Sequence, residues 1–182
     1  VMEEDNKVRI KLLSYDENGN LTNVVSNTLK QNILNYLSQF RMINDYIQID
    51  VAKVIDLAFD IYVVVESNVN RGQVITEIIN QVSNYMTPGN RDMGQNVNVS
   101  DVRRLIQNTA GVISLSNLQV FNLVGGQYST SETSQAYVNK ATREIRLIDD
   151  NIYAEPSQIY QIRFDNKDIR VYVKNLANVD FS

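Results

Sequence analysis

The stretch Val54–Glu66 constrains the fold more than any other part of the sequence. Apolar side chains occupy every second position from Ile55 to Val65, and Asp56 and Asp60 stand between them. This alternation is typical of a β-strand, in which successive side chains point to opposite faces. We therefore expect a central strand with one face in the core and with both carboxylates pointing to water on the other face.

The segments around this strand alternate between helix and strand patterns. Residues 28–40 and 70–86 place apolar side chains at helical spacing, and a short helix begins at Ser100 or Asp101. Further strand patterns occupy residues 7–12, 46–51 and 112–123. This order predicts an α+β fold with a ferredoxin-like, split β-α-β layer, in which helices cover one face of a mostly antiparallel sheet. The apolar face of the 28–40 helix is expected to be buried.

The chain changes character at Gly125-Gly126, which is followed by a polar run and then by strand patterns. We divide it into an α+β domain, residues 1–124, and a β-rich C-terminal module, residues 125–182. Within the module, residues 165–168 are predicted to join two strands as a hairpin over 159–174. The other candidate strands of the module are 136–139 and 144–148.

The composition excludes several classes of chemistry. Among 182 residues there is neither Cys nor His, so a thiolate zinc site, a cysteine nucleophile and a histidine base are absent. The net charge of −4 argues against nucleic acid or an anionic membrane as a partner. No apolar run of about 18 residues occurs, so no membrane insertion is expected. We predict no catalytic, metal-binding or cofactor-binding residue, no cofactor and no enzymatic activity.

The sequence starts at Val1 and not at a methionine, which suggests a fragment of a longer protein.

The loop PGNRDMGQN, residues 88–96, has the glycine spacing of a phosphate-binding loop. Gln95 and Asn96 stand where such a loop needs Lys and Ser or Thr, and a helix rather than a strand precedes it. We therefore interpret it as a connector between helices.

Two charged clusters are better explained by solvation than by catalysis. Asp149-Asp150 is predicted to be a solvated turn, because nothing in the sequence indicates that either carboxylate is desolvated. Arg103-Arg104, with Arg91, is predicted to lie on an exposed helix face.

The last two strands place basic and aromatic side chains opposite their core-facing set. Tyr and Arg are enriched at protein interfaces, where they bury area and form directional hydrogen bonds. We predict an interface made of Arg163, Arg170, Tyr172 and Lys174. In this prediction Arg170→Glu weakens association without unfolding the protein.

Several segments together resemble the baseplate J-like family of contractile-tailed phages. The resemblance lies in NTLKQNILNYLSQFRMINDYIQI, AKVIDLAFDIYVVV, ITEIINQVSNYM, NVNVSDVRRLIQNTAGVISLSNLQV, EIRLIDDNIYAEPSQIYQIRF and DIRVYV. It implies the C-terminal part of a structural baseplate wedge subunit, located in the virion tail and assembled in the host cytoplasm. It further implies pairing with a second copy, contacts with other wedge proteins in a ring that rearranges before sheath contraction, and no catalytic residue.

Two other hypotheses about the function remain. The chain could be a ferredoxin-like regulatory domain that binds a small ligand, in which case a ligand should raise its thermal stability. It could also be an enzyme that uses Asp149 or Asp150. If the chain is instead a structural subunit of an assembly, we expect no small-molecule substrate and a protein interface of at least about 1,000 Å².

Overall fold

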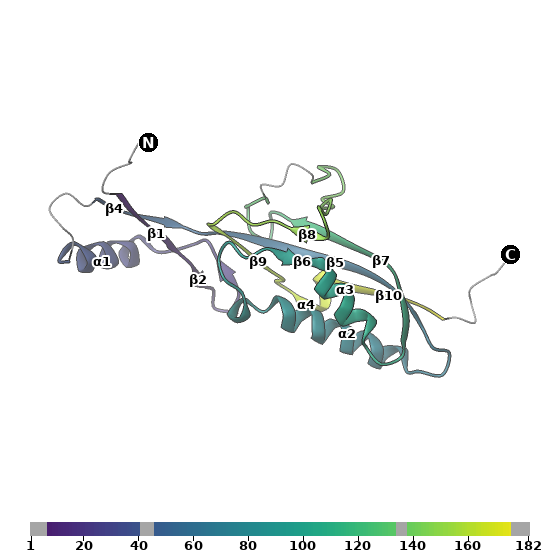
Figure 1. Cartoon of the computed structure of the whole chain (residues 1–182). Helices are drawn as coiled ribbons and strands as arrows, with labels where there is room; N and C mark the ends of the chain where they lie inside the picture. The colour runs from purple at the N-terminus through teal and green to yellow at the C-terminus, as the bar shows by residue number, and fades with distance from the viewer. Residues whose placement is uncertain (1–6, 41–45, 134–137, 176–182) are drawn as a thin grey trace. The chain divides into compact units, whose positions relative to one another are not determined.

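A computed structural model describes residues 7–40, 46–133 and 138–175 of the chain. Backbone contacts divide it into two compact units, Val1–Val54 and Ile55–Ser182, which we describe separately. The boundary predicted at residue 124 falls inside the second unit. Helices and strands are mixed throughout, so the fold belongs to the α+β class (Figure 1).

The first unit contains a parallel β-α-β arrangement. Its elements are β1 Lys7–Leu12, β2 Ser14–Tyr15, β3 Leu21–Thr22, α1 Asn27–Ser38 and β4 Tyr46–Val51. β1 and β4 pair in parallel, with Ile10 opposite Ile49, and α1 lies between them in the sequence. Ser26 caps α1, because its hydroxyl accepts a hydrogen bond from the Leu29 N–H at 3.2 Å. The expectation that one face of this helix is buried is wrong, since no residue of α1 is buried.

The second unit is built around one long strand. Its elements are β5 Lys53–Val65, α2 Arg71–Met86, the 3-10 turn η1 Pro88–Asn90, β6 Val97–Asn98, α3 Val99–Gln107, β7 Val112–Leu123, β8 Asn151–Ile152, β9 Gln158–Gln161, α4 Asp165–Asp168 and β10 Ile169–Asn175. β5, which begins at the end of the first unit, pairs antiparallel with β7 and parallel with β10, and β9 also pairs with it. Phe59 thus lies between Val120 on one side and Ile169 on the other.

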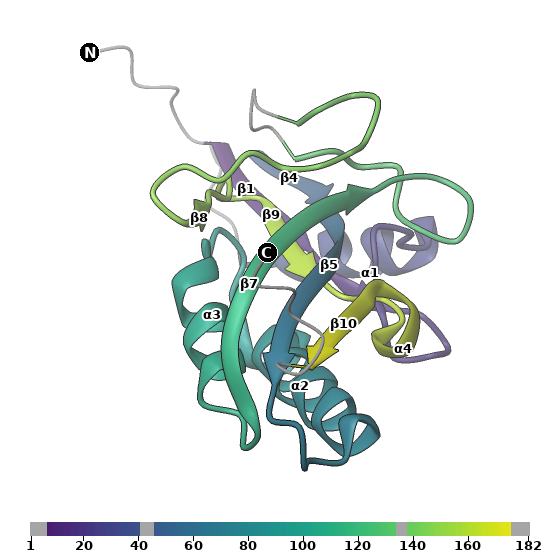
Figure 2. The ribbon, with the colours of Figure 1, turned by 90° about the vertical axis from the view of Figure 1, so that its right-hand side faces the viewer.

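The predicted inward face of β5 is confirmed. Its odd-numbered residues from Ile55 to Val65 are buried and pack in one cluster with apolar side chains of α2 and α3. The helical contributors are Val74, Ile78, Val82, Met86, Val99, Val102 and Ile106. Figure 2 shows α2 and α3 together on one side of the curved sheet.

The predicted hairpin 159–174 is wrong. β9 and β10 both pair with β5, and the residues between them form the helical turn α4. This turn closes because the Asp168 N–H donates to the Phe164 carbonyl at 2.8 Å while the Phe164 N–H donates to the Asp168 carboxylate at 2.9 Å. Alternation in β10 fixes which side chains share a face, but it does not fix which strand lies alongside.

Gly111 makes the turn from α3 into β7 possible. Its φ is +85°, and a Cβ at this position would come within 2.9 Å of the Val69 side chain. Both features require a residue without a side chain.

Gly111→Ala should therefore lower the free energy of unfolding by about 1–3 kcal/mol, since it adds left-handed backbone strain to a close contact. Urea unfolding followed by circular dichroism measures this. Gly89→Ala is the matched control, because a Cβ at Gly89 meets no atom within 4 Å. Equal effects of the two substitutions would contradict the role given to Gly111.

Candidate protein interface

The side of the sheet away from α2 and α3 carries three of the four predicted interface residues. The parallel register places Arg170 opposite Asp60, Tyr172 opposite Tyr62 and Lys174 opposite Val64. Because alternate residues of a strand share a face, Arg170, Tyr172 and Lys174 form a row on the outward face of β10. The expectation of an outward row on β10 is confirmed.

Arg163, the fourth predicted residue, lies elsewhere. Its side chain is only 14% exposed, and its Nε approaches the Asp56 Oδ1 at 3.5 Å as an ion pair. β9 ends at Gln161, so Arg163 does not follow the strand alternation on which the prediction was based. We therefore remove Arg163 from the interface and assign it to the buried network around Asp56.

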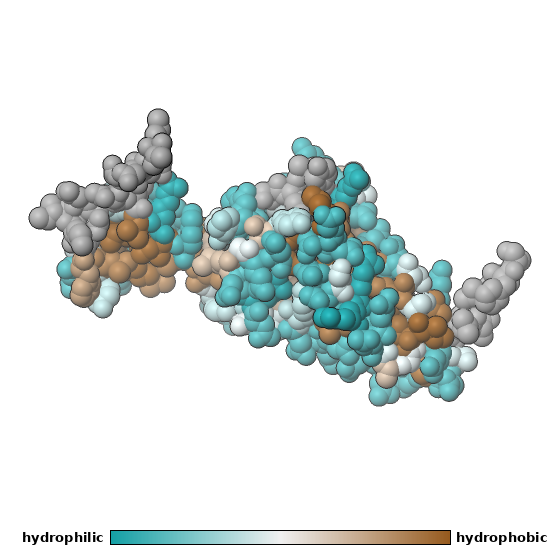
Figure 3. Space-filling model, in the orientation of Figure 1, coloured by the Kyte–Doolittle hydropathy of each residue, from teal (hydrophilic) through white to brown (hydrophobic). Residues whose placement is uncertain are grey.

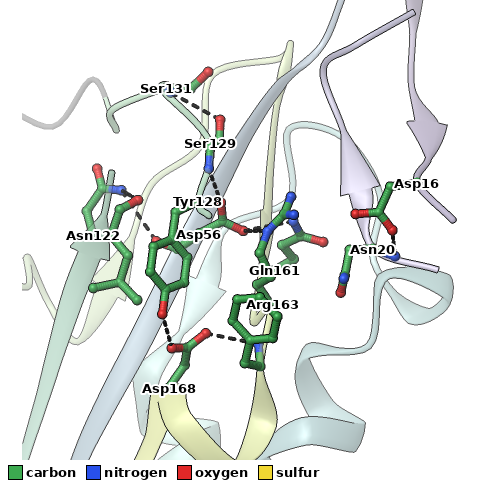
Figure 4. A network of polar contacts seen from close by, with 12 residues as sticks. Asp16, Asn20, Asp56, Asn122, Tyr128, Ser129, Ser131, Gln161, Arg163 and Asp168 are labelled. Atoms are coloured by element: carbon green, nitrogen blue, oxygen red, sulfur yellow. Dashed lines mark hydrogen bonds and ion pairs between the residues drawn. The ribbon is translucent and has the colours of Figure 1, made fainter. Parts of the chain in front are cut away.

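Asp56 is the centre of that network (Figure 4). It is fully buried and accepts hydrogen bonds from the Ser129 backbone N–H and, at 2.8 Å, from the Gln161 amide. The expectation that Asp56 is exposed to water is therefore wrong, because residues 125–133, which include Ser129, cover this end of the outward face. We call residues 125–133 the covering segment. Asp60, on the same face, is also buried, so the same expectation fails there.

Burial raises the pKa of the Asp56 carboxyl above its ordinary value. The Ser129 N–H, the Gln161 amide and the Arg163 guanidinium act in the opposite direction, because each stabilises the charged form. The desolvation of the carboxylate outweighs them. A raised pKa means that the folded chain holds this proton more tightly than the unfolded chain does.

A second buried carboxylate, Asp168, anchors the same covering segment. The Tyr128 hydroxyl donates to the Asp168 Oδ1 at 2.7 Å, and the Tyr128 ring meets the Phe164 ring edge to face. Burial, and then the hydrogen bond to Asp168, raises the pKa of the Tyr128 hydroxyl. Asn122 adds a further tie, since its amide oxygen accepts from the buried Thr133 N–H at 2.9 Å. Residues 125–133 are therefore fixed over one end of the sheet.

Arg170 stands at the border between the covered and the open parts of the sheet. Its guanidinium forms an ion pair with Asp60 and lies 5.5 Å from the centre of the Phe121 ring. Arg170 of β10 therefore contacts both β5, through Asp60, and β7, through Phe121, while its side chain stays half exposed.

The open sheet face is the part of the outward side beyond this border. It comprises Tyr62, Val64, Ser114, Asn117, Tyr172 and Lys174. Tyr62 and Tyr172 stack with ring centroids 4.6 Å apart and planes at 14°, and Tyr172 is 44% exposed. A stacked aromatic pair with amide, hydroxyl and ammonium groups around it can bury apolar area and form hydrogen bonds at its edge, which suits a protein partner.

The remaining charged candidates have structural partners. Arg91 is buried rather than exposed, with its guanidinium donating to the Asn96 carbonyl at 2.7 Å, so it holds the 88–96 loop closed. Asp149 and Asp150 form a turn with positive φ, in which Asp150 accepts from the Ser100 hydroxyl at 3.1 Å. Arg103 lies 3.7 Å from the same Asp150 carboxylate.

A surface groove of about 470 Å³ runs beside the first half of α2. Its lining combines apolar side chains with amides and one carboxylate: Val69, Asn70, Gln73, Val74, Glu77, Gln81, Ala110 and Gly111. Among the described residues there is no group of three or more Asp or Glu placed to hold a metal ion. No helix within residues 7–40, 46–133 and 138–175 is long and apolar enough to cross a membrane.

Comparisons with models of known protein families and with curated protein sequences found no match to this chain.

Asp56→Ala should lower the free energy of unfolding by about 3–5 kcal/mol, because it leaves the Arg163 charge and two buried donors without their acceptor. Asp92→Ala, which removes the same charge from an exposed loop position, should change it by less than about 0.5 kcal/mol. Urea unfolding of both variants measures the difference. If Asp56→Ala and Asp92→Ala lowered the free energy of unfolding by similar amounts, Asp56 would not be an anchor of the covering segment.

The pH dependence of stability provides a separate test of the burial of Asp56. Because the pKa is raised in the folded state, the stabilising contribution of the protonated carboxyl is complete below the ordinary value of 3.8 and is lost as the pH rises through the folded pKa. The stability of the wild type relative to Asp56→Asn should therefore fall as the pH rises above 3.8. A stability difference between the wild type and Asp56→Asn that stays constant or grows as the pH rises would contradict a raised pKa of Asp56 in the folded state.

Proposed function

We propose that the chain is a structural assembly module, the C-terminal part of the inner-ring baseplate wedge protein of a contractile-tailed phage. In this role it associates with its own copies and contacts other wedge proteins in the ring that rearranges before sheath contraction. It would be located in the tail baseplate of the virion, after assembly in the host cytoplasm. The sequence resemblance to the baseplate J-like family supports this assignment, and the finer ferredoxin-like description of the fold is part of the same proposal.

The observation that carries the proposal is the open sheet face. Tyr62 and Tyr172 are already stacked on each other, so little side-chain freedom is lost when a partner covers them. The two carboxylates on the outward face of β5 itself form ion pairs inside the protein, Asp56 with Arg163 and Asp60 with Arg170. What remains accessible is an aromatic surface with Lys174 at its edge, and aromatic residues of this kind contribute much of the binding energy at protein interfaces.

Tyr172→Ala and Lys174→Glu should each weaken self-association of the chain, the first by about tenfold or more, as expected for an aromatic residue at an interface. Light scattering coupled to size exclusion, over a range of concentrations, gives the weight-average molar mass. Tyr153→Ala is the matched control, since Tyr153 is 42% exposed, close to the 44% of Tyr172, and lies outside the open sheet face. Lys140→Glu is the control for the charge change.

Association that is insensitive to both Tyr172→Ala and Lys174→Glu would rule out the open sheet face as the contact. We choose these two residues instead of Arg170. Arg170→Glu would place a second carboxylate against buried Asp60 and lower stability, so its effect on association would not be interpretable on its own.

A small-ligand regulatory domain is the second candidate, and the groove beside α2 is the observation that favours it. The two functions differ in what stabilises the folded chain. Ligand binding would give a saturable rise in the melting temperature at constant protein concentration, whereas self-association would make the melting temperature depend on protein concentration itself.

A further inference from the structure

One side of α1 exposes large apolar side chains to solvent. Leu29 is 46% exposed, Tyr36 is 62% exposed and Phe40, just after the helix, is 69% exposed. Ile33 lies between them in the same row and is partly buried. We call Leu29, Ile33, Tyr36 and Phe40 the α1 stripe. Figure 3 shows a hydrophobic area over α1, at the left of the view.

The α1 stripe is distinct from the side by which α1 packs within its own unit. Partial burial is found at Lys30, Ile33, Leu34 and Leu37, which share one face at helical spacing, and α1 contacts β4. Only Ile33 belongs to both sets. Each of the other three stripe residues is classed as exposed, so the packing of α1 on β4 leaves the stripe available for a further contact.

The stripe has the spacing of a helix-pairing seam. Its residues follow one another at intervals of four, three and four positions, which is the alternation of the two apolar positions in a heptad. The Tyr36 and Phe40 rings are 5.1 Å apart, so they present one continuous aromatic surface rather than two isolated side chains. A partner that fits this surface is another helix with an apolar row of similar spacing.

The charge of α1 favours a second copy of this chain as that partner. Lys30 is the one charged residue in Asn27–Ser38, although the whole chain has a net charge of −4 and two copies therefore repel each other in general. The residues flanking the stripe are mainly Asn, Gln, Ser and Thr. Their amides and hydroxyls both donate and accept hydrogen bonds, so two identical surfaces can pair about a two-fold axis without a clash of like groups.

We propose that the α1 stripe pairs with the α1 stripe of a second copy, as a self-complementary contact between the two helices. This inference deepens the proposed function and rests on its self-association. It also gives the chain two separate association surfaces, α1 and the open sheet face, and two different contacts per subunit are needed to connect dimers into a ring.

The first test variant is Leu29→Glu, because it places a charge at one end of the stripe without weakening the helix. Ser26 is the N-cap and residue 29 is the third helical position, so a glutamate there completes a capping box and places a negative charge at the helix N-terminus. Tyr36→Glu tests the other end of the stripe. Gln31→Glu is the matched control, since it adds the same charge to an exposed position of the same helix outside the stripe.

Sedimentation or light scattering of the full chain over a dilution series gives the dissociation constant of the dimer. We expect Leu29→Glu and Tyr36→Glu each to raise it by about tenfold or more, and Gln31→Glu to change it by less than about threefold. Circular dichroism of each variant checks that the helix content is kept. Unchanged dimerisation in both stripe variants would overturn the inference.

The outcomes separate this inference from the proposed function. If Tyr172→Ala weakens association and the stripe variants do not, the assembly role stands and the α1 contact is refuted. If the stripe variants alone weaken it, the α1 contact stands and the open sheet face is not the contact. A wild-type chain that is monomeric at every concentration overturns the α1 contact and self-association together.

Cross-linking gives a second readout that does not depend on folding energetics. The chain has no cysteine, so one introduced thiol per subunit reports on one position. A thiol at the middle of α1, as in Asn32→Cys, should be joined to its own copy by a short bismaleimide, because a two-fold contact brings the middle of each helix together. The control Ser38→Cys lies near the helix end and off the stripe, and it should cross-link far less. Equal yields from the two variants would contradict the pairing.

Discussion

Asp56 holds together parts of the second unit that are far apart in the sequence. Its buried carboxylate receives the backbone N–H of Ser129, the amide of Gln161 and the guanidinium of Arg163, and so joins β5 to the covering segment and to the end of β9. A buried carboxylate is tolerated only when such donors surround it. Those donors are in place only when residues 125–133 and the chain after β9 are folded against β5. The Asp56 carboxylate therefore positions residues 125–133 together with the Tyr128–Asp168 and Asn122–Thr133 hydrogen bonds.

This arrangement decides which surfaces are left for partners. The charged groups on the outward side of β5 are consumed by internal pairs with Arg163 and Arg170, and the covering segment closes one end of that side. Two of the exposed surfaces carry aromatic or apolar side chains, namely the Tyr62–Tyr172 stack in the second unit and the α1 stripe in the first. These two surfaces are the candidate contacts in the assembly role that we propose.

Local pattern was enough to predict some features and not others. The alternation in β5 gave its inward face correctly, and the helical spacing of Val74, Ile78 and Val82 gave α2, because both depend on neighbouring residues alone. Alternation also placed Tyr172 and Lys174 outward. Alternation could not show that Ser129, more than seventy positions further along the chain, covers Asp56. It also could not show that the partner strand of β10 is β5 and not β9. The exposure of α1 was missed for the opposite reason, since an amphipathic pattern shows that a face needs cover without showing that the cover comes from the same chain.

Amide hydrogen exchange at low and high protein concentration tests whether the exposed aromatic and apolar surfaces are covered by other copies of the chain. Association should slow exchange in the elements that carry those surfaces and leave already buried strands unchanged. We predict that protection of α1 and β10 rises with protein concentration, while β5 around Asp56 is equally protected at every concentration. Protection of α1 and β10 that does not depend on concentration would show that other copies of the chain do not cover these surfaces.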